Sequence, residues 1–184
     1  MIVLAITLCL LVISAQGQIP VDKCPDVKVV ADFDGRAYLG DWYELGRYPT
    51  LLEDHGKCVV TNIAVNSDGS IKSRTQYINS ETNETHVLEG EAQPGSTTGE
   101  GKFLVHFLNP DVTVPFWVLG TDYEGYSVGF SCFERDGVTL ESLFLTTRTP
   151  NPPRDQVDAI IQVLEDNGID LLPVILTDQE DCTY

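Results

Sequence analysis

The sequence has 184 residues, with 28 acidic and 11 basic side chains and a net charge of −17 at pH 7. Such an acidic surface repels nucleic acids and anionic membranes, which excludes the usual nucleic-acid-binding classes. The length suits one domain with a sizeable core.

The first segment, residues 1–17, predicts a secretory signal peptide. It has no charged side chain, its residues 2–13 are almost wholly apolar, and Ala15 and Gly17 are the small residues that signal peptidase reads. The run is too short to span a bilayer, and no other run approaches the ~20 apolar residues that a span needs. We therefore expect a secreted protein without a membrane span, whose folded domain covers residues 18–184.

Removal of the signal peptide leaves the cysteines Cys24, Cys58, Cys132 and Cys182. Four cysteines in an exported chain predict two disulfides, for which three connectivities are possible. No two of them sit at the close spacing of metal clips, so we expect no metal site. Residues 18–38, which contain Cys24, are expected to form an irregular lead-in.

Residues 38–49 hold three tyrosines and Trp42, and the residues after Gly40 predict a first strand. A tryptophan near the start of a strand typically plugs a core. Gly40 can supply a positive φ or a close backbone approach, and Pro49 ends the extended run.

Seven more extended runs follow, at residues 58–65, 71–78, 86–92, 102–108, 116–121, 126–133 and 140–147. Short turns separate them, and the Asp68-Gly69 pair is a strong hairpin signal.

The apolar spacing typical of a helix occurs once. It is carried by residues at i, i+3, i+4 and i+7, which are Val157, Ile160, Ile161 and Leu164, and it ends before Gly168. Eight meandering strands and one late amphipathic helix predict an all-β fold, an eight-stranded antiparallel up-and-down barrel with the C-terminal helix packed outside. A short extended piece, residues 174–177, follows the helix.

Strand alternation gives information about the interior of this barrel. Phe116 shares a face with Val118, Thr75 shares one with Tyr77, and Phe144 lies between Ser142 and Thr146. These faces mix aromatic with small polar side chains, unlike a solid aliphatic core. The mixture is typical of a ligand cavity.

Three short motifs resemble the signature regions of the lipocalin family. They are residues 40–43 at the first strand, residues 121–123 after the sixth, and Arg148 at the end of the eighth, and the signature positions are Gly40, Trp42, Thr121, Asp122, Tyr123 and Arg148. Blocks at residues 43–49, 122–132, 148–153 and 167–182 are similar to the branch of the family that contains apolipoprotein D and the insect bilin-binding lipocalins.

The resemblance implies that Trp42 and Arg148 make a cation–π contact at the closed end of the barrel. It also implies that Cys24 pairs with Cys132 and Cys58 with Cys182.

For the ligand, the resemblance implies aromatic pocket residues at Phe107, Phe116 and Phe144, whereas Ile63 replaces a polar or charged residue of the family. Together with alternation, it gives the expected ligand-binding set Ile63, Thr75, Tyr77, Phe107, Phe116, Val118 and Phe144.

Catalysis is not expected, and no catalytic residue is predicted. Residues 125–129 match the Gly-x-Ser-x-Gly pattern, but they lie in a predicted strand and all three histidines precede Ser127. His55, His86 and His106 are too dispersed for a metal site, and disulfide formation would leave no free thiol. Glu44 and Glu89 are expected to be solvated or rim carboxylates. Asn83 opens an Asn-Glu-Thr sequon and is a predicted glycosylation site.

The leading hypothesis is a secreted carrier of one small hydrophobic molecule, such as a fatty acid, a steroid, a retinoid or a bilin. No cofactor is expected, although a bilin chromophore would fit as the ligand. The alternative is an interaction protein with a filled barrel and partner-binding loops, and an enzyme ranks third. The sequence identifies no receptor.

Overall fold

The computed structural model of the protein describes residues 18–50, 52–53 and 55–184, so the predicted signal peptide lies outside the described residues. The described chain contains one helix, α1 (Arg154–Asn167), and ten strands. The strands are β1 (Ile19–Val21), β2 (Gly40–Arg47), β3 (Gly56–Val65), β4 (Ile71–Asn79), β5 (Thr85–Pro94), β6 (Lys102–Leu108), β7 (Asp111–Thr121), β8 (Tyr126–Arg135), β9 (Val138–Thr147) and β10 (Ile175–Leu176).

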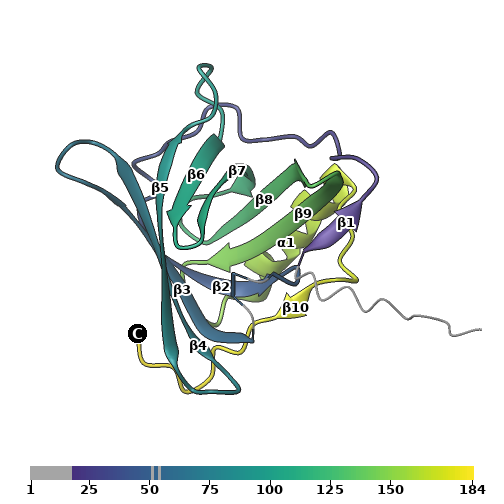
Figure 1. Cartoon of the computed structure of the whole chain (residues 1–184). Helices are drawn as coiled ribbons and strands as arrows, with labels where there is room; N and C mark the ends of the chain where they lie inside the picture. The colour runs from purple at the N-terminus through teal and green to yellow at the C-terminus, as the bar shows by residue number, and fades with distance from the viewer. Residues whose placement is uncertain (1–17, 51, 54) are drawn as a thin grey trace, which may run out of the picture.

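Strands β2 to β9 form a closed antiparallel barrel, which confirms the predicted fold (Figure 1). Each strand pairs with its neighbour in the chain, and β9 pairs back with β2 to close the cylinder. Closure leaves no long edge strand exposed to other chains. The short strands β1 and β10 pair with β9 and β2 respectively.

Two elements differ from the sequence-based expectation. Strand β1 lies in the segment predicted to be irregular, because its three residues are too few for a visible alternation. Strand β7 begins at Asp111 rather than at residue 116, so Pro115 lies inside it. Pairing of β7 with β8 starts only at Trp117, so Pro115 has one strand neighbour, and proline is tolerated at such a site.

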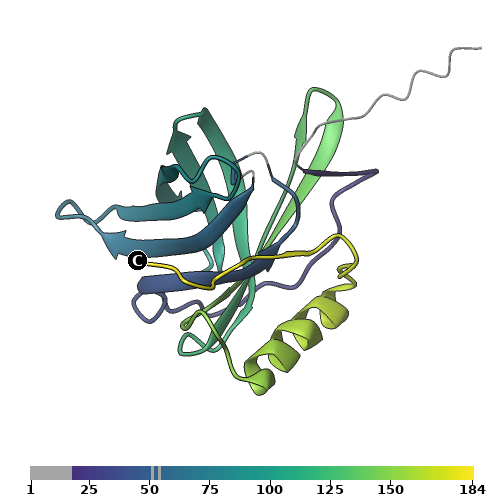
Figure 2. The ribbon, with the colours of Figure 1, turned by 90° about the horizontal axis from the view of Figure 1, so that it is seen from below.

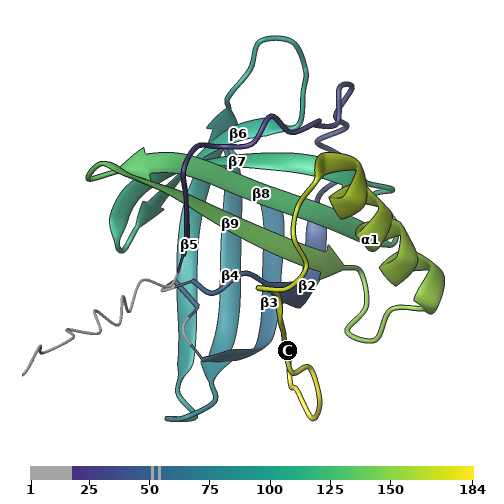
Figure 3. The same cartoon turned by 90° about the vertical axis from the view of Figure 1, so that its right-hand side faces the viewer.

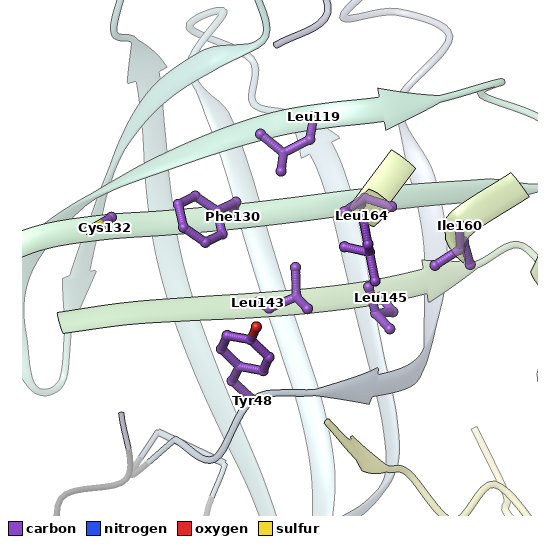
Figure 4. Packing of buried hydrophobic residues seen from close by; sticks show 9 residues of the cluster. Tyr48, Leu119, Phe130, Cys132, Leu143, Leu145, Ile160 and Leu164 are labelled. Atoms are coloured by element: carbon purple, nitrogen blue, oxygen red, sulfur yellow. The ribbon is translucent and has the colours of Figure 1, made fainter. Parts of the chain in front are cut away.

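The helix α1 packs outside the barrel, as Figure 2 and Figure 3 show. Its buried residues Ile160 and Leu164 belong to a hydrophobic cluster between the helix and the outer face of the barrel. This cluster also includes Phe130 and Leu143 (Figure 4). Gly168 ends the helix with a φ of 64° and a backbone N–H that caps the last turn. Within the described residues, no helix is long and apolar enough to cross a bilayer.

The two disulfides have the connectivity that the resemblance implied. Cys24 bonds to Cys132 and fixes the lead-in segment to β8. Cys58 bonds to Cys182 and fixes the C-terminal tail to β3. Each disulfide therefore joins one end of the described chain to the barrel wall.

The C-terminal tail fills a seam between β2 and β3. These two strands pair only from Gly40 to Tyr43 of β2, and beyond that point they separate. The amide of Thr177 donates to the carbonyl of Leu45, and the side-chain amide of Gln179 donates to the carbonyls of both Glu44 and Val59. The tail thus completes the barrel wall on this side.

Candidate ligand-binding cavity

The closed end of the barrel is sealed by Trp42 and Arg148. The guanidinium carbon lies 3.6 Å from the centroid of the indole ring, which confirms the predicted cation–π contact. Arg148 also donates hydrogen bonds to the backbone carbonyls of Ala37, Asp41 and Tyr123 at 2.9–3.0 Å. One side chain therefore ties the lead-in, β2 and the β7–β8 turn together.

The remaining signature residues lie at the same end. Gly40 has a φ of 100°, and a Cβ there would stand 3.3 Å from the Arg148 guanidinium. The Asp122 carboxylate accepts hydrogen bonds from two backbone amides of its turn, and the Thr121 hydroxyl accepts one from the Tyr123 amide. These groups hold the turn beneath Arg148, so the signature has a structural role.

Above this floor the barrel encloses a cavity. About 170 Å³ is open to the centre of a water molecule, over ten times the ~10–15 Å³ that one water requires. The lining is mainly apolar, and its aromatic part includes Trp42 and six phenylalanines: Phe33, Phe103, Phe107, Phe116, Phe133 and Phe144. A concave, mainly apolar space with few polar groups is typical of small-molecule sites.

Gly129 makes room for one of the aromatic rings. A Cβ at this position of β8 would lie 2.5 Å from Cζ of Phe116, closer than any side chain permits. Phe116 in turn lies 6.3 Å from Phe144, centroid to centroid. The absent side chain of Gly129 therefore lets these two rings form one wall of the cavity.

The lining also contains polar side chains. The hydroxyls of Thr61 and Thr75 are 2.8 Å apart, and the Gln18 side-chain amide donates to the Ser142 hydroxyl at 3.0 Å. The Ser131 hydroxyl is buried and has no hydrogen-bond partner among the described residues. These groups can orient a ligand that carries its own polar atom.

A group of buried charged side chains lies at β2 and the β2–β3 connection. Glu44 and Glu53 line the cavity at 3% and 6% exposure, and Arg47 lies beside them at 4%. Nη1 of Arg47 donates to Oε1 of Glu44 at 2.7 Å, and Nη2 donates to the Glu53 backbone carbonyl at 2.7 Å. The Thr177 hydroxyl donates to the same Glu44 oxygen. Buried ions need such pairing, since their desolvation is costly.

The Glu53 carboxyl is less well paired than Glu44. Its Oε2 is 3.8 Å from Nε of Arg47, and neither atom has a hydrogen-bond partner among the described residues. Burial raises the pKa of Glu53 well above its usual range, and the nearby Glu44 carboxylate raises it further, while Arg47 acts in the opposite direction. Glu53 thus keeps its proton to higher pH than an ordinary carboxyl.

The structure brings five of the seven expected ligand-binding residues onto the cavity wall: Ile63, Thr75, Phe107, Phe116 and Phe144. The other two expected residues are not part of the lining. Val118 is fully buried beneath the cavity, where it packs against Tyr38 and Trp42. Tyr77 is buried and stacks on His86, with ring centroids 5.1 Å apart. Alternation identified the inward face correctly but gave no depth along the barrel axis.

The expectation for Glu44 is wrong, whereas Glu89 is solvated. Glu44 is buried in the wall, and Glu89 pairs with Lys72 on the outer surface. The signal was available, because Glu44 follows Trp42 by two residues and therefore shares its inward face. Glu53 had no such signal, since it lies in the β2–β3 connection.

The structure shows where the residues of the Gly-x-Ser-x-Gly pattern lie. Ser127 lies within strand β8 rather than on a sharp turn, and its hydroxyl is buried 2.8 Å from that of Tyr38. Burial raises the pKa of Tyr38 to about 12. The described residues contain no cluster of three or more His, Cys, Asp or Glu that could hold a metal ion. Asn83 lies in the β4–β5 turn, exposed, with a φ of 58°.

Comparison with known proteins gives one family. A family model described as Lipocalin-like domain matches residues 33–179. Apolipoprotein D from Macaca fascicularis is 34% identical over 176 residues, which covers 92% of this chain and 89% of the relative. The match confirms the resemblance to apolipoprotein D that the sequence motifs indicated.

Solved structures share the architecture. Insecticyanin from the tobacco hornworm Manduca sexta superposes with a TM-score of 0.79 at 24% identity, over 91% of this chain and 94% of that one. Lobster apocrustacyanin A1 gives a TM-score of 0.75 at 20% identity, over 90% and 92% of the two chains. At these identities the likeness establishes the fold alone.

Proposed function

The chain belongs to the lipocalin family, and on that premise we propose that it is an exported carrier that holds one small apolar molecule inside its barrel. The observation that carries the proposal is the aromatic-lined cavity above the Trp42–Arg148 floor. Binding then rests on burial, since apolar area removed from water contributes roughly 25 cal/mol per Å².

Fatty acids, steroids, retinoids and bilins are the candidate ligand classes. A bound bilin would colour the purified protein, so an absorbance spectrum tests that class at once. Extraction of the protein from its native source, followed by mass spectrometry of the bound molecule, would identify the ligand directly.

Two neighbouring residues of β5 provide a matched test of the site. Leu88 lines the cavity, whereas Val87 points outward and is 42% exposed. Leu88→Trp fills the cavity and should reduce the affinity for a fluorescent apolar probe at least about tenfold. Val87→Trp adds the same bulk outside and should leave the affinity unchanged. Equal affinities in both variants and the wild type would contradict binding inside the barrel.

The cavity also weighs against the two other functions. A filled barrel that acts only through its loops would not leave open space beside Phe107, Phe116 and Phe144. An enzyme would need an assembled nucleophile or acid–base pair, and Ser127 is instead buried against Tyr38. A free-thiol assay on the folded protein is the further test, because reactive thiols would reopen the case for catalysis.

The proposal also includes secretion of the protein and glycosylation of Asn83. Disulfides persist in oxidising compartments, so the two bonds described above support passage through the secretory pathway. The exposure of Asn83 in a turn supports its use as a glycan acceptor. N-terminal sequencing of the secreted protein would test cleavage after Gly17, and glycosidase treatment followed by mass measurement would test Asn83.

A further inference from the structure

Among the described residues, the charged side chains that line the cavity are all acidic. Among the described residues that line it, Glu44 and Glu53 are the only ones with an acidic or basic side chain, apart from the phenol of Tyr38. No lysine, arginine or histidine of the described chain is part of the lining. A carrier of carboxylates needs a cation or several donors at the ligand's head group, because an unpaired buried carboxylate loses its hydration without compensation.

The nearest cation is already occupied. Arg47 gives Nη1 to the Glu44 carboxylate and Nη2 to the Glu53 carbonyl, and it contributes no atoms to the cavity lining. The Glu44 oxygen that Arg47 contacts is also held by the Thr177 hydroxyl. The Glu44 carboxylate would therefore repel an anionic ligand that enters the cavity, and no cation of the described residues lines the cavity to offset this repulsion.

Glu53 offers a different kind of contact. Glu53 is only 6% exposed and belongs to the cavity lining, and one of its carboxyl oxygens is buried without a hydrogen-bond partner among the described residues. Because its pKa is raised, the group is an uncharged carboxylic acid over a wider pH range, and a carboxylic acid both donates and accepts hydrogen bonds. Such an acid can form hydrogen bonds with a hydroxyl group or a carbonyl group of a ligand.

We propose that the cavity selects its ligand by charge, taking an uncharged apolar molecule that carries a hydroxyl or carbonyl group beside Glu53 and rejecting carboxylates. The proposal rests on the carrier function and narrows it. Long-chain alcohols, hydroxylated or keto steroids and retinol fit this description. Fatty-acid anions and retinoic acid do not.

The test compares ligands that differ only in the end group. Retinol and retinoic acid are titrated at neutral pH against the full mature protein, with quenching of tryptophan fluorescence as the readout, since Trp42 lines the cavity. Hexadecan-1-ol and hexadecanoate are compared by displacement of a fluorescent probe. The alcohol of each pair should bind at least about tenfold tighter than the acid.

The outcomes separate the two proposals. An acid that binds as tightly as its alcohol, or more tightly, overturns charge selection and leaves the carrier function standing. Failure of every ligand and probe to bind overturns the carrier function, and charge selection falls with it.

A substitution tests which residue sets the preference. Glu44→Gln keeps an acceptor for Arg47 but removes the negative charge, so the guanidinium becomes an uncompensated cation beside the cavity. The acid should then gain at least about tenfold in affinity relative to its alcohol. Glu91→Gln removes the same charge from the outer face of β5 and should leave the ratio unchanged. A ratio that shifts equally in both variants would point to overall charge and overturn the assignment to Glu44. Circular dichroism checks folding, and the wild-type comparison stands if Glu44→Gln misfolds.

Discussion

Arg148 lies over the indole of Trp42 at 3.6 Å, and its three nitrogens each donate to a different backbone carbonyl. Three of the four interactions join segments that are over 100 residues apart in the chain, such as Ala37 and Arg148, and the fourth reaches Tyr123 in the β7–β8 turn. A single guanidinium therefore replaces the hydrogen bonds that strands would otherwise supply at the closed end of the barrel. Its planar, permanently charged shape suits this task in a way that a lysine would not.

Substitution of Arg148 should destabilise the protein without changing its fold. Arg148→Met leaves three carbonyls without their donor and removes the cation–π contact, for an expected loss of about 2–5 kcal/mol. Guanidinium denaturation gives the free energy of unfolding. Arg154→Met is the control, because the Arg154 side chain is 91% exposed on α1. A loss for Arg148→Met no larger than that of the control would contradict the sealing role.

Gly129 should be intolerant of even one methyl group. Gly129→Ala places a Cβ within 2.5 Å of Phe116, so the ring must move into the cavity, and binding of apolar probes should weaken. The double variant Gly129→Ala with Phe116→Ala should recover part of that binding. Val87→Ala is the control, since this exposed side chain lies outside the barrel and its truncation should leave binding unchanged. Unchanged binding in Gly129→Ala, measured by probe titration, would show that the aromatic wall does not contact the ligand.

The raised pKa of Glu53 predicts that its contribution to stability falls as pH rises. The folded protein binds this proton more tightly than the unfolded chain, whose glutamate pKa is near 4.5, so unfolding releases a proton between 4.5 and the folded value. The contribution is fully present below pH 4.5 and is lost as pH rises through the folded pKa. Glu53→Gln should abolish this slope, as measured by denaturant unfolding at a series of pH values. Parallel curves for wild type and Glu53→Gln would refute the prediction, and Glu91→Gln serves as the charge-matched control.

The Cys58–Cys182 disulfide should hold the tail in its seam. Replacing both cysteines with serine should cost about 2–5 kcal/mol, the usual range for a native disulfide. The amides of Cys58 and Thr177, which donate to Asp178 and Leu45, should then exchange with solvent faster. Hydrogen exchange measures this directly. Removing the Cys24–Cys132 bond instead should leave these two amides protected, and equal exchange in both variants would mean that the disulfide does not position the tail.

The barrel could be predicted because its strands are long enough to show their period. Runs such as residues 126–133 and 140–147 have apolar or small residues at alternate positions and turns between them, and the structure places β8 and β9 there. The resemblance to the lipocalin family added the contact of Trp42 with Arg148 at the closed end. Strand β1 was missed because three residues around Pro20 show no period, and their pairing with β9 comes from tertiary contact alone.

The candidate site was only partly predictable. Alternation assigns a residue to the inner or outer face, so it placed Phe116 and Phe144 correctly. It cannot tell the cavity from the packed floor below, where the structure places Val118 against Tyr38 and Trp42. The Glu53 contact depends on how the β2–β3 connection folds back toward Arg47, a long-range arrangement that no local pattern in the sequence encodes.

The tail that fills the β2–β3 seam also determines when the barrel can be finished. The ribosome makes residues 175–182 after strands β2 to β9, so the wall beside Glu44 stays incomplete until those residues have also been made. Cys58 must wait for a partner that is 124 residues further along the chain. A chain truncated before Gln179 would consequently leave the cell's folding machinery with an open-sided barrel and an unpaired thiol.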